Sequence, residues 1–267
     1  MSRRAALELA RRRARPVLPW VAPVVLVLLW ELSSRRGWIS ADLAPAPLDV
    51  LRAAISATKH QQLLTHLLVS TGRAGLGTLI GSAIGLTLGL ATGLSRPLQL
   101  LLDGPLQMLR AVPALALVPL VILWFGLGET AKIFIVVVTV VFPVYLNTFH
   151  GVRSVDPQLV EMARVYDVRG FALYREVILP GALPSILVGL RFALGMSWLV
   201  IIIAETLGAT SGLGYLAGNA RDFMQMDMLV LTIVLWGMLG KGADLLARGL
   251  ERWLLPWQPK AQRMSAD

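Results

Sequence analysis

The chain contains no cysteine and only three histidines among its 267 residues. The absence of cysteine excludes disulfides and thiolate metal sites. The histidines, His60, His66 and His150, are scattered along the sequence and do not have the spacing of a metal site. We therefore expect neither a metal nor a cofactor to be bound by this chain.

Charged residues are also scarce. They make up 15% of the chain, whereas soluble domains carry about a quarter. Hydrophobic residues make up 56%, and the mean hydropathy is +0.68. A chain this apolar needs lipid as its solvent, and helices satisfy their own backbone hydrogen bonds in lipid. The composition therefore predicts an all-α integral membrane protein.

Six apolar segments approach the roughly 20 residues that are needed to cross a bilayer. They cover residues 17–32, 63–94, 111–125, 130–149, 185–206 and 226–240. Between the first two, Pro45 and Pro47 predict an extended turn, followed by a surface helix over 48–58. After the sixth, residues 243–255 mix leucines with charges, which predicts a cytoplasmic extension lying at the membrane interface.

The net charge of +9 raises the question of nucleic-acid binding, and the positions of the basic residues answer it. If the N-terminus is cytoplasmic, the second and fourth loops between the spans and the C-terminal tail are cytoplasmic as well. Together with the N-terminal tail, these segments contain most of the 25 Lys and Arg residues. Cytoplasmic loops of membrane proteins carry such an excess. The bias predicts that both termini are cytoplasmic, and it indicates orientation rather than contact with nucleic acid.

The first apolar run follows an Arg-rich tail and so also resembles a secretory signal. No small-residue cleavage site closes the run, and Glu31 lies at its end. We therefore expect an uncleaved first span.

Glycine recurs at every fourth position of the second span, at Gly77, Gly81, Gly85, Gly89 and Gly93. Such a stripe lets another backbone approach closely, as helices pack in lipid. The partner is either another helix of the same chain or a second subunit.

The third segment contains Pro105, Pro113 and Pro119, which indicates either a pathway wall or a merely kinked span.

The loop between the fourth and fifth spans is charged and patterned. Asp156 followed by Pro157 is a helix-start signal. From there Leu159, Met162, Ala163 and Tyr166 share one helical face, and Glu161 lies on another. Residues 167–170 predict a turn, 171–177 a second short helix, and Pro180 its end. This amphipathic loop predicts a docking site for a partner.

The same loop resembles the EAA motif of bacterial ATP-binding-cassette (ABC) importer permeases: Glu-Ala-Ala, three residues, Gly, nine residues, Ile, one residue, Leu-Pro. The chain aligns Glu161-Met162-Ala163, then Asp167, then Val177 and Leu179-Pro180. Asp167 replaces the glycine of the turn, and Asp is among the few residues that tolerate a left-handed backbone. Residues 107–134, 142–153, 177–195 and 212–223 are similar to the nitrate/sulfonate/taurine branch, and most of all to its aliphatic sulfonate permeases.

This resemblance implies a type I (MetI-like) permease fold with six transmembrane helices in the bacterial inner membrane. It implies a homodimer in lipid, with an ATPase subunit holding ATP and Mg²⁺ on each cytoplasmic loop and a periplasmic substrate-binding protein. The chain itself is expected not to be an enzyme, since Gly240-Lys241-Gly242 lacks the rest of a Walker A pattern. The expected ATPase-coupling residues are Leu159, Glu161, Met162, Ala163, Tyr166, Asp167, Gly170 and Pro180.

The resemblance divides the chain into a basic tail (1–16), a first span with its periplasmic connection (17–60), a permease core with the coupling loop at 156–180 (61–255) and a C-terminal tail (256–267). A sulfonate route needs apolar walls and modest positive potential. Asn147, Ser197 and Trp198 are its candidate contacts, and Arg191 either attracts the anion or extends to lipid phosphates. Glu205 in the fifth span is either a functional intramembrane carboxylate or, because it lies near the outer end, simply hydrated.

Other functions remain open from the sequence. A secondary carrier would be expected to contain internal repeats and a coupling-ion site. A membrane scaffold without transport activity would not need a broken third segment. Within the importer class, taurine, nitrate or another small anion is the alternative substrate.

Overall fold

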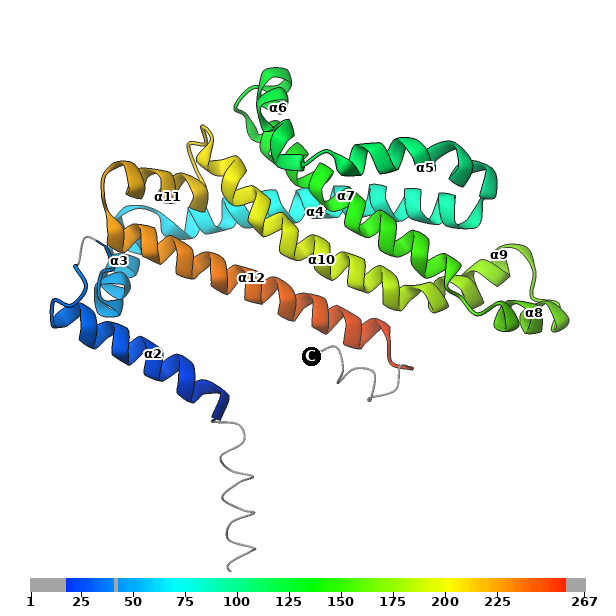
Figure 1. Ribbon diagram of the computed structural model, residues 1–267, viewed down its shortest axis with the longest axis horizontal. Coiled ribbons are helices and arrows are strands. Elements are labelled where there is room, and N and C mark those ends of the chain that lie inside the picture. Colours follow the sequence, from blue (N-terminus) through cyan, green and yellow to red (C-terminus); the bar gives the residue numbers. More distant parts are fainter. Residues whose placement is uncertain (1–17, 41–42, 258–267) are drawn as a thin grey trace, which may run out of the picture. The chain divides into compact units, whose positions relative to one another are not determined.

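The computed structural model describes residues 18–40 and 43–257, and these residues form helices joined by short turns (Figure 1). They divide into two compact units. Among the described residues, one unit contains those up to 64 together with 216–234, and the other contains 65–215 together with 235–257. The prediction of an all-α fold is confirmed for the part of the chain that is described.

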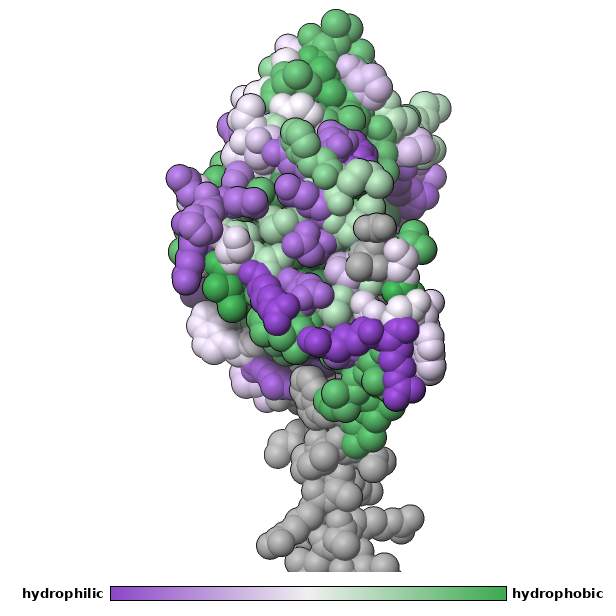
Figure 2. Space-filling view, turned by 90° about the vertical axis from the view of Figure 1, so that its left-hand side faces the viewer, coloured by the Kyte–Doolittle hydropathy of each residue, from purple (hydrophilic) through white to green (hydrophobic). Residues whose placement is uncertain are grey.

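The first unit contains α2 (Leu18–Arg35) and α3 (Pro47–His60). Pro47 occupies the first turn of α3, where a missing N–H costs nothing. The side chain of Glu31 in α2 accepts a hydrogen bond from the Leu48 amide at 3.1 Å and so links the two helices. The surface helix expected over 48–58 is thus present. Figure 2 shows hydrophilic and hydrophobic residues mixed on the face that it views.

Most of the first predicted span lies in α2, while Val17 falls outside the described residues. The basic tail at 1–16 and most of the C-terminal tail also fall outside the described residues.

The second unit is built on α4 (Leu63–Leu94) and α7 (Glu129–Arg153), which pack in parallel. Each glycine of the α4 stripe faces a residue of α7 that lies 59 positions later: Gly77 faces Val136, Gly81 faces Val140, Gly85 faces Val144, Gly89 faces Thr148, and Gly93 faces Val152. These α7 residues are buried. A Cβ on any of the five glycines would lie within 3.0 Å of α7. The stripe therefore serves packing within one chain, the first of the two alternatives.

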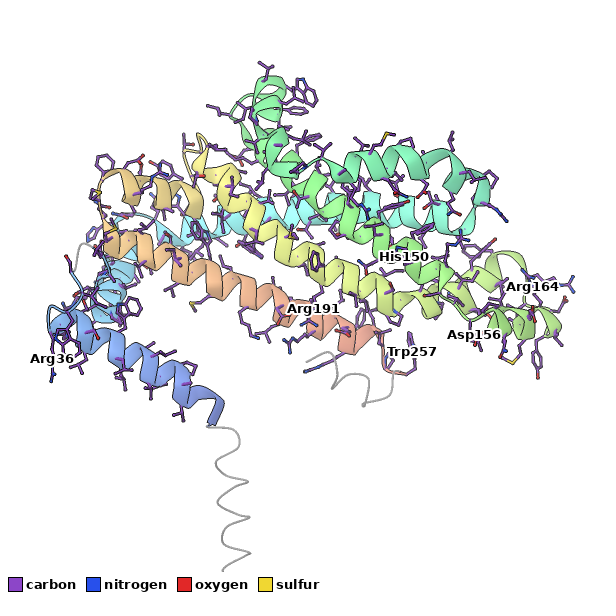
Figure 3. All side chains as sticks on the ribbon, viewed as in Figure 1. Arg36, His150, Asp156, Arg164, Arg191 and Trp257 are labelled. Carbon is purple, nitrogen blue, oxygen red and sulfur yellow. The ribbon has the colours of Figure 1, made fainter. Side chains whose placement is uncertain are left out.

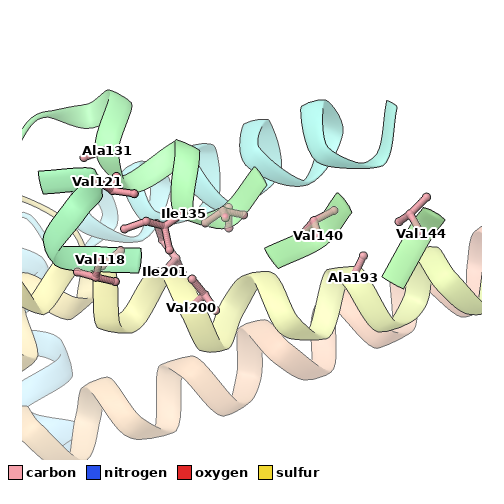
Figure 4. Packing of buried hydrophobic residues seen from close by; sticks show 12 residues of the cluster. Val118, Val121, Ala131, Ile135, Val140, Val144, Ala193, Val200 and Ile201 are labelled. Carbon is pink, nitrogen blue, oxygen red and sulfur yellow. The ribbon is translucent and has the colours of Figure 1, made fainter. Parts of the chain in front are cut away.

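A second face of α7 packs antiparallel against α10 (Leu179–Thr206). Gly189 of α10 lies against Asn147, and Gly151 of α7 lies against Ser185. Between them a cluster of buried aliphatic side chains forms the core of the unit (Figure 4). It contains valines, isoleucines and alanines, among them Val121, Ile135, Val140, Val200 and Ile201.

The third apolar segment is broken rather than straight. It consists of α5 (Arg96–Ala111), a 3-10 turn (η1, Ala114–Leu117) and α6 (Val118–Phe125), with a bend of 81°. Val112 is extended because Pro113 disfavours a helical conformation in the residue before it. The predicted start at residue 111 was therefore wrong, whereas the interruption that the prolines indicate is present.

The helix predicted to end at Pro180 does not end there. The chain runs from α9 (Gly170–Leu173) through a π turn (η2, Tyr174–Ile178) directly into α10. In the π turn the Leu179 amide donates to the Tyr174 carbonyl, five residues back. Pro180 thus lies in the first turn of α10, where proline is tolerated.

The last long helix also differs from the prediction. After α11 (Leu213–Asp222), α12 runs without a break from Met226 to Leu254. The expected end at residue 240 and the separate interfacial segment 243–255 were therefore wrong, because the mixed leucines and charges continue the same helix.

Four helical segments of the described chain are long and apolar enough to span a membrane, and the bent pair makes up to five. They are Leu63–Leu94, Glu129–Arg153, Gly170–Thr206 and Met226–Leu254. A multi-pass membrane protein is confirmed, whereas the count of six spans is not.

Candidate functional site

The predicted docking loop begins with α8 (Pro157–Val165). The carboxylate of Asp156 accepts a hydrogen bond from the Gln158 amide at 2.8 Å, and Pro157 is the first helical residue. Asp156 and Arg164 lie at opposite ends of α8 in Figure 3. The expected N-cap is therefore present.

Asp167 has a left-handed backbone with φ +62°. The Val168 amide donates to the Ala163 carbonyl at 2.9 Å, and the Asp167 amide donates to the Arg164 carbonyl at 3.0 Å. These two bonds form a Schellman motif, which usually has glycine at this position. The expectation that Asp167 adopts the conformation of a turn glycine is met, and Gly170 follows with φ +57°.

Three of the four apolar residues predicted on one face of α8 are exposed. Leu159 is 48%, Met162 54% and Tyr166 77% accessible, but Ala163 is only 8% accessible. Ala163 lies at the edge of the stripe, on the side where α8 packs against α9 and the π turn. The exposed surface therefore consists of Leu159, Met162 and Tyr166, with the exposed Glu161 on another face.

Two of the residues expected along the pathway contact the protein itself. The Asn147 side-chain amide donates to the Pro143 carbonyl at 2.9 Å, and Asn147 packs on Gly189. Ser197 is buried and donates to the Leu194 carbonyl at 2.8 Å. Both side chains are engaged in the packing of α7 and α10.

The other two candidate pathway residues, Trp198 and Arg191, also have partners within the chain. Trp198 packs against the buried aliphatic cluster. Arg191 of α10 is half-buried and forms an ion pair of 2.9 Å with Asp244 of α12 (Figure 3). Asp244 also pairs with Arg248 at 2.9 Å and Lys241 at 3.5 Å. The charge of Arg191 is thus partly balanced, which weakens its field on an anion.

A buried ionic network, which the sequence analysis missed, joins the ends of three helices in the second unit. Arg73 of α4 is 4% and Glu205 of α10 1% accessible, and Nη1 of Arg73 lies 2.7 Å from Oε1 of Glu205. Every other N–H of this guanidinium also donates, to both carboxylate oxygens of Glu129 and to the carbonyl and hydroxyl of Ser211. Of the two alternatives for Glu205, hydration at the outer end was therefore wrong.

Both carboxylate oxygens of Glu205 have further hydrogen-bond partners within the chain. Ser70 lies 2.7 and 2.8 Å from the two carboxylate oxygens, and the Gly214 amide donates to Oε2 at 2.9 Å. A Cβ on Gly212 would lie 2.4 Å from the Glu205 carboxylate, and one on Gly214 would lie 2.5 Å from its Cβ. The two glycines therefore leave the space that the carboxylate fills.

Comparison with known proteins gives a family match over most of the chain. Residues 63–255 match the family described as "Binding-protein-dependent transport system inner membrane component". This range contains α4 to α12, and so includes the predicted docking loop, the broken segment and the buried network.

Individual relatives resemble the chain over nearly its whole length. It is 53% identical to the "Putative aliphatic sulfonates transport permease protein SsuC" of Escherichia coli (strain K12), covering 91% of this chain and 92% of that protein. It is 42% identical to the protein of the same name from Bacillus subtilis (strain 168), covering 88% and 86%. Identity to the taurine transport system permease TauC of Escherichia coli is 33%, covering 89% and 88%.

Solved structures share the fold at low sequence identity. An amino acid ABC transporter with histidines matches with a TM-score of 0.62 and 21% identity, covering 74% of this chain and 97% of that one. An inward-facing MetNI methionine ABC transporter matches with a TM-score of 0.58 and 18% identity, covering 71% and 96%. At these identities the likeness supports the type I permease fold alone.

Proposed function

The chain belongs to the binding-protein-dependent transport system inner membrane components, and from this membership we propose that it is the permease subunit of an ABC importer for aliphatic sulfonates. The observation that carries the substrate is the 53% and 42% identity to two aliphatic sulfonate permeases from different bacteria. Identity to the taurine permease and to a bicarbonate permease is lower, at 33% and 30%. Taurine, nitrate or another small anion is therefore the second candidate.

The work of transport comes from ATP hydrolysed on a partner subunit that docks on the coupling loop. Leu159, Met162 and Tyr166 project apolar side chains from α8, and such anchors suit the groove of a partner protein. The helix is held at a defined angle by the Asp156 cap at its start and the Schellman motif at its end.

The loop also has the connections that transmission of force needs. Ser154 and Val155 join it to α7, and the π turn joins it without a break to α10. Because α7 and α10 pack along their length, a displacement of α8 moves the helices of the core as well. A partner ATPase that closes and opens would thereby change the conformation of the permease.

The assembled importer contains two copies of this chain in the inner membrane, with both termini in the cytoplasm. The excess of basic residues on the predicted cytoplasmic side supports this orientation. A periplasmic binding protein delivers the sulfonate to the outer face.

The test is an ATPase measurement on the complex reconstituted in nanodiscs. A sulfonate-loaded binding protein should stimulate ATP hydrolysis severalfold, whereas the same protein loaded with taurine or nitrate should stimulate it less. Failure of the chain to co-purify with an ATPase subunit would favour a secondary carrier or a scaffold. Stimulation by taurine or nitrate alone would reassign the substrate.

A further inference from the structure

A pocket of about 250 Å³ lies between α5 and α7 in the second unit. The α7 side is a third face of that helix, separate from the faces that pack on α4 and α10. Its residues follow helical spacing and are mostly aromatic or apolar: Phe142, Tyr145, Leu146, Phe149 and His150. Tyr145 and Phe149 stack with their ring centroids 6.1 Å apart. This side forms a largely aromatic and apolar wall that ends at the exposed His150.

The α5 side of the pocket is polar, which is unusual for a helix in a membrane. It is lined by Gln99, Asp103, Leu106, Gln107 and Arg110. The apolar residues Leu100, Leu101 and Met108 of the same helix are exposed on its outside. Polar groups at membrane depth line water-filled cavities or contact polar ligands. The arrangement therefore indicates a hydrated cavity rather than a lipid-facing kink.

Most polar groups on this side already have partners within the chain. Gln107 donates to the Asp103 carboxylate at 3.0 Å. Gln99 accepts a hydrogen bond from Arg153, whose guanidinium also lies 5.6 Å from the ring centre of Phe149. These contacts fix the end of the pocket near the last residue of α7.

Arg110 is the exception. It has no hydrogen bond or ion pair to any residue that the structure describes, and it follows Gln99 by about three turns of α5. It therefore places an unpaired guanidinium at the opposite end of the pocket. Arg110 is exposed, so its guanidinium is accessible to a ligand, and its planar donors suit an oxyanion.

We propose that this pocket is the sulfonate-binding site of the membrane subunit, with Arg110 binding the sulfonate group and the α7 wall contacting the alkyl chain. The proposal rests on the proposed function and adds a location and a rule of selectivity to it. The volume lies just below the roughly 300–1,000 Å³ of drug-sized ligand sites, and so suits a ligand of few heavy atoms.

The aromatic wall explains how the site distinguishes among small anions. Each methylene that moves from water onto Phe142, Tyr145 or Leu146 strengthens binding by about fourfold. A nitrate ion has no such chain, and the ammonium group of taurine would lose hydration against the rings. The pocket therefore favours unsubstituted alkanesulfonates of increasing chain length.

The absence of native cysteine allows a direct test in the assembled transporter in nanodiscs. Leu146→Cys places one thiol in the wall, and methanethiosulfonate reagents then label it. One reagent carries an ethanesulfonate anion and the other a trimethylammonium cation. Labelling of the permease subunit is followed by mass spectrometry, with and without butanesulfonate. Leu100→Cys, on the outer face of α5, is the control site.

We expect the anionic reagent to label Leu146→Cys about tenfold faster than the cationic one, after correction for their intrinsic rates. Butanesulfonate should slow this labelling, and butylammonium should not. Arg110→Gln should raise the butanesulfonate concentration needed for protection by about 10- to 100-fold, as loss of a charged hydrogen-bond partner does. Arg110→Lys should keep most of the protection, and Arg96→Gln, on the same helix outside the pocket, should keep all of it.

Absence of labelling, or labelling that butanesulfonate does not slow, overturns the pocket as the binding site. Protection that survives Arg110→Gln overturns the role of Arg110 and points to lipid as its partner. In both cases sulfonate uptake by the unmodified transporter shows that the importer function stands without this site. Loss of sulfonate uptake in the unmodified transporter instead contradicts the proposed function itself.

Discussion

At the scale of single residues, Asp167 has a conformation that glycine adopts more readily. Its φ of +62° closes the turn after α8, and its exposed ion pair with Arg169 at 3.0 Å contributes little. We expect Asp167→Gly to change the free energy of unfolding by less than about 1 kcal/mol.

Asp167→Val should cost about 1–3 kcal/mol, because a β-branched side chain is strained at positive φ. It should also impair coupling, which is measured as uptake per ATP hydrolysed. A valine variant with normal stability and coupling would contradict the role of this turn.

Glu205 and Arg73 allow a second prediction at this scale. Glu205→Ala leaves a buried guanidinium without its main counterion and should cost about 3–5 kcal/mol. Glu129 contacts the same guanidinium, but its side chain is 59% exposed. Glu129→Gln should therefore cost less than about 1 kcal/mol. Thermal unfolding of both variants in detergent measures the difference, and equal losses would show that burial does not set the strength of this network.

At the scale of elements, the contact between α4 and α7 depends on the glycine stripe. A Cβ on Gly85 would lie 2.5 Å from the Val141 carbonyl oxygen, which is backbone and cannot move aside. Gly85→Ala should therefore destabilise the fold by about 1–3 kcal/mol. Gly75→Ala, on the same helix with nothing within 4 Å, should be neutral or stabilising by up to about 1 kcal/mol. The opposite order in unfolding temperature would rule out this packing.

The exposed stripe on α8 makes a separate prediction about the partner. Met162→Asp and Tyr166→Asp should each lower the recovery of the ATPase subunit in co-purification by at least tenfold, since buried anchors dominate such interfaces. Val165→Asp is the matched control, because Val165 is exposed on the same helix but away from the stripe. Loss of the partner in the control alone would place the docking face elsewhere. Ala163 is unsuitable for this test because it is buried within the loop.

Much of this element pattern could be predicted from the sequence, because its signals are local. The bounds of α4 match the apolar run at 63–94, and the Asp156-Pro157 pair marks the start of α8. The continuation through Pro180 could not be predicted, since it depends on a π turn that accommodates the proline. The length of α12 was missed because charges among leucines suit an interfacial segment equally well.

Parts of the candidate site were missed for a different reason. Arg73 and Glu205 are 132 residues apart, and only the fold brings them together. Without this pairing, Glu205 at the end of an apolar run is expected to be hydrated. The one available signal was the Gly212-Leu213-Gly214 sequence, because its glycines leave the space for the carboxylate.

At the scale of the whole molecule, we propose a permease whose conformation is changed by a partner ATPase. The core helices pack tightly through glycines and small residues, whereas the surface that we propose contacts the ATPase is a short exposed helix. Sulfonate transport should therefore require ATP hydrolysis by a partner subunit. An ion gradient should not be able to replace the ATP.

The most direct measurement is uptake of radiolabelled butanesulfonate into proteoliposomes that contain the permease and its ATPase subunit. The binding protein is added outside, and ATP is enclosed within. We expect accumulation against a gradient, and we expect this accumulation to stop when the ATPase subunit carries an inactivating substitution. Accumulation driven by a proton or sodium gradient without ATP, or accumulation of nitrate or taurine in place of butanesulfonate, would contradict the proposed function.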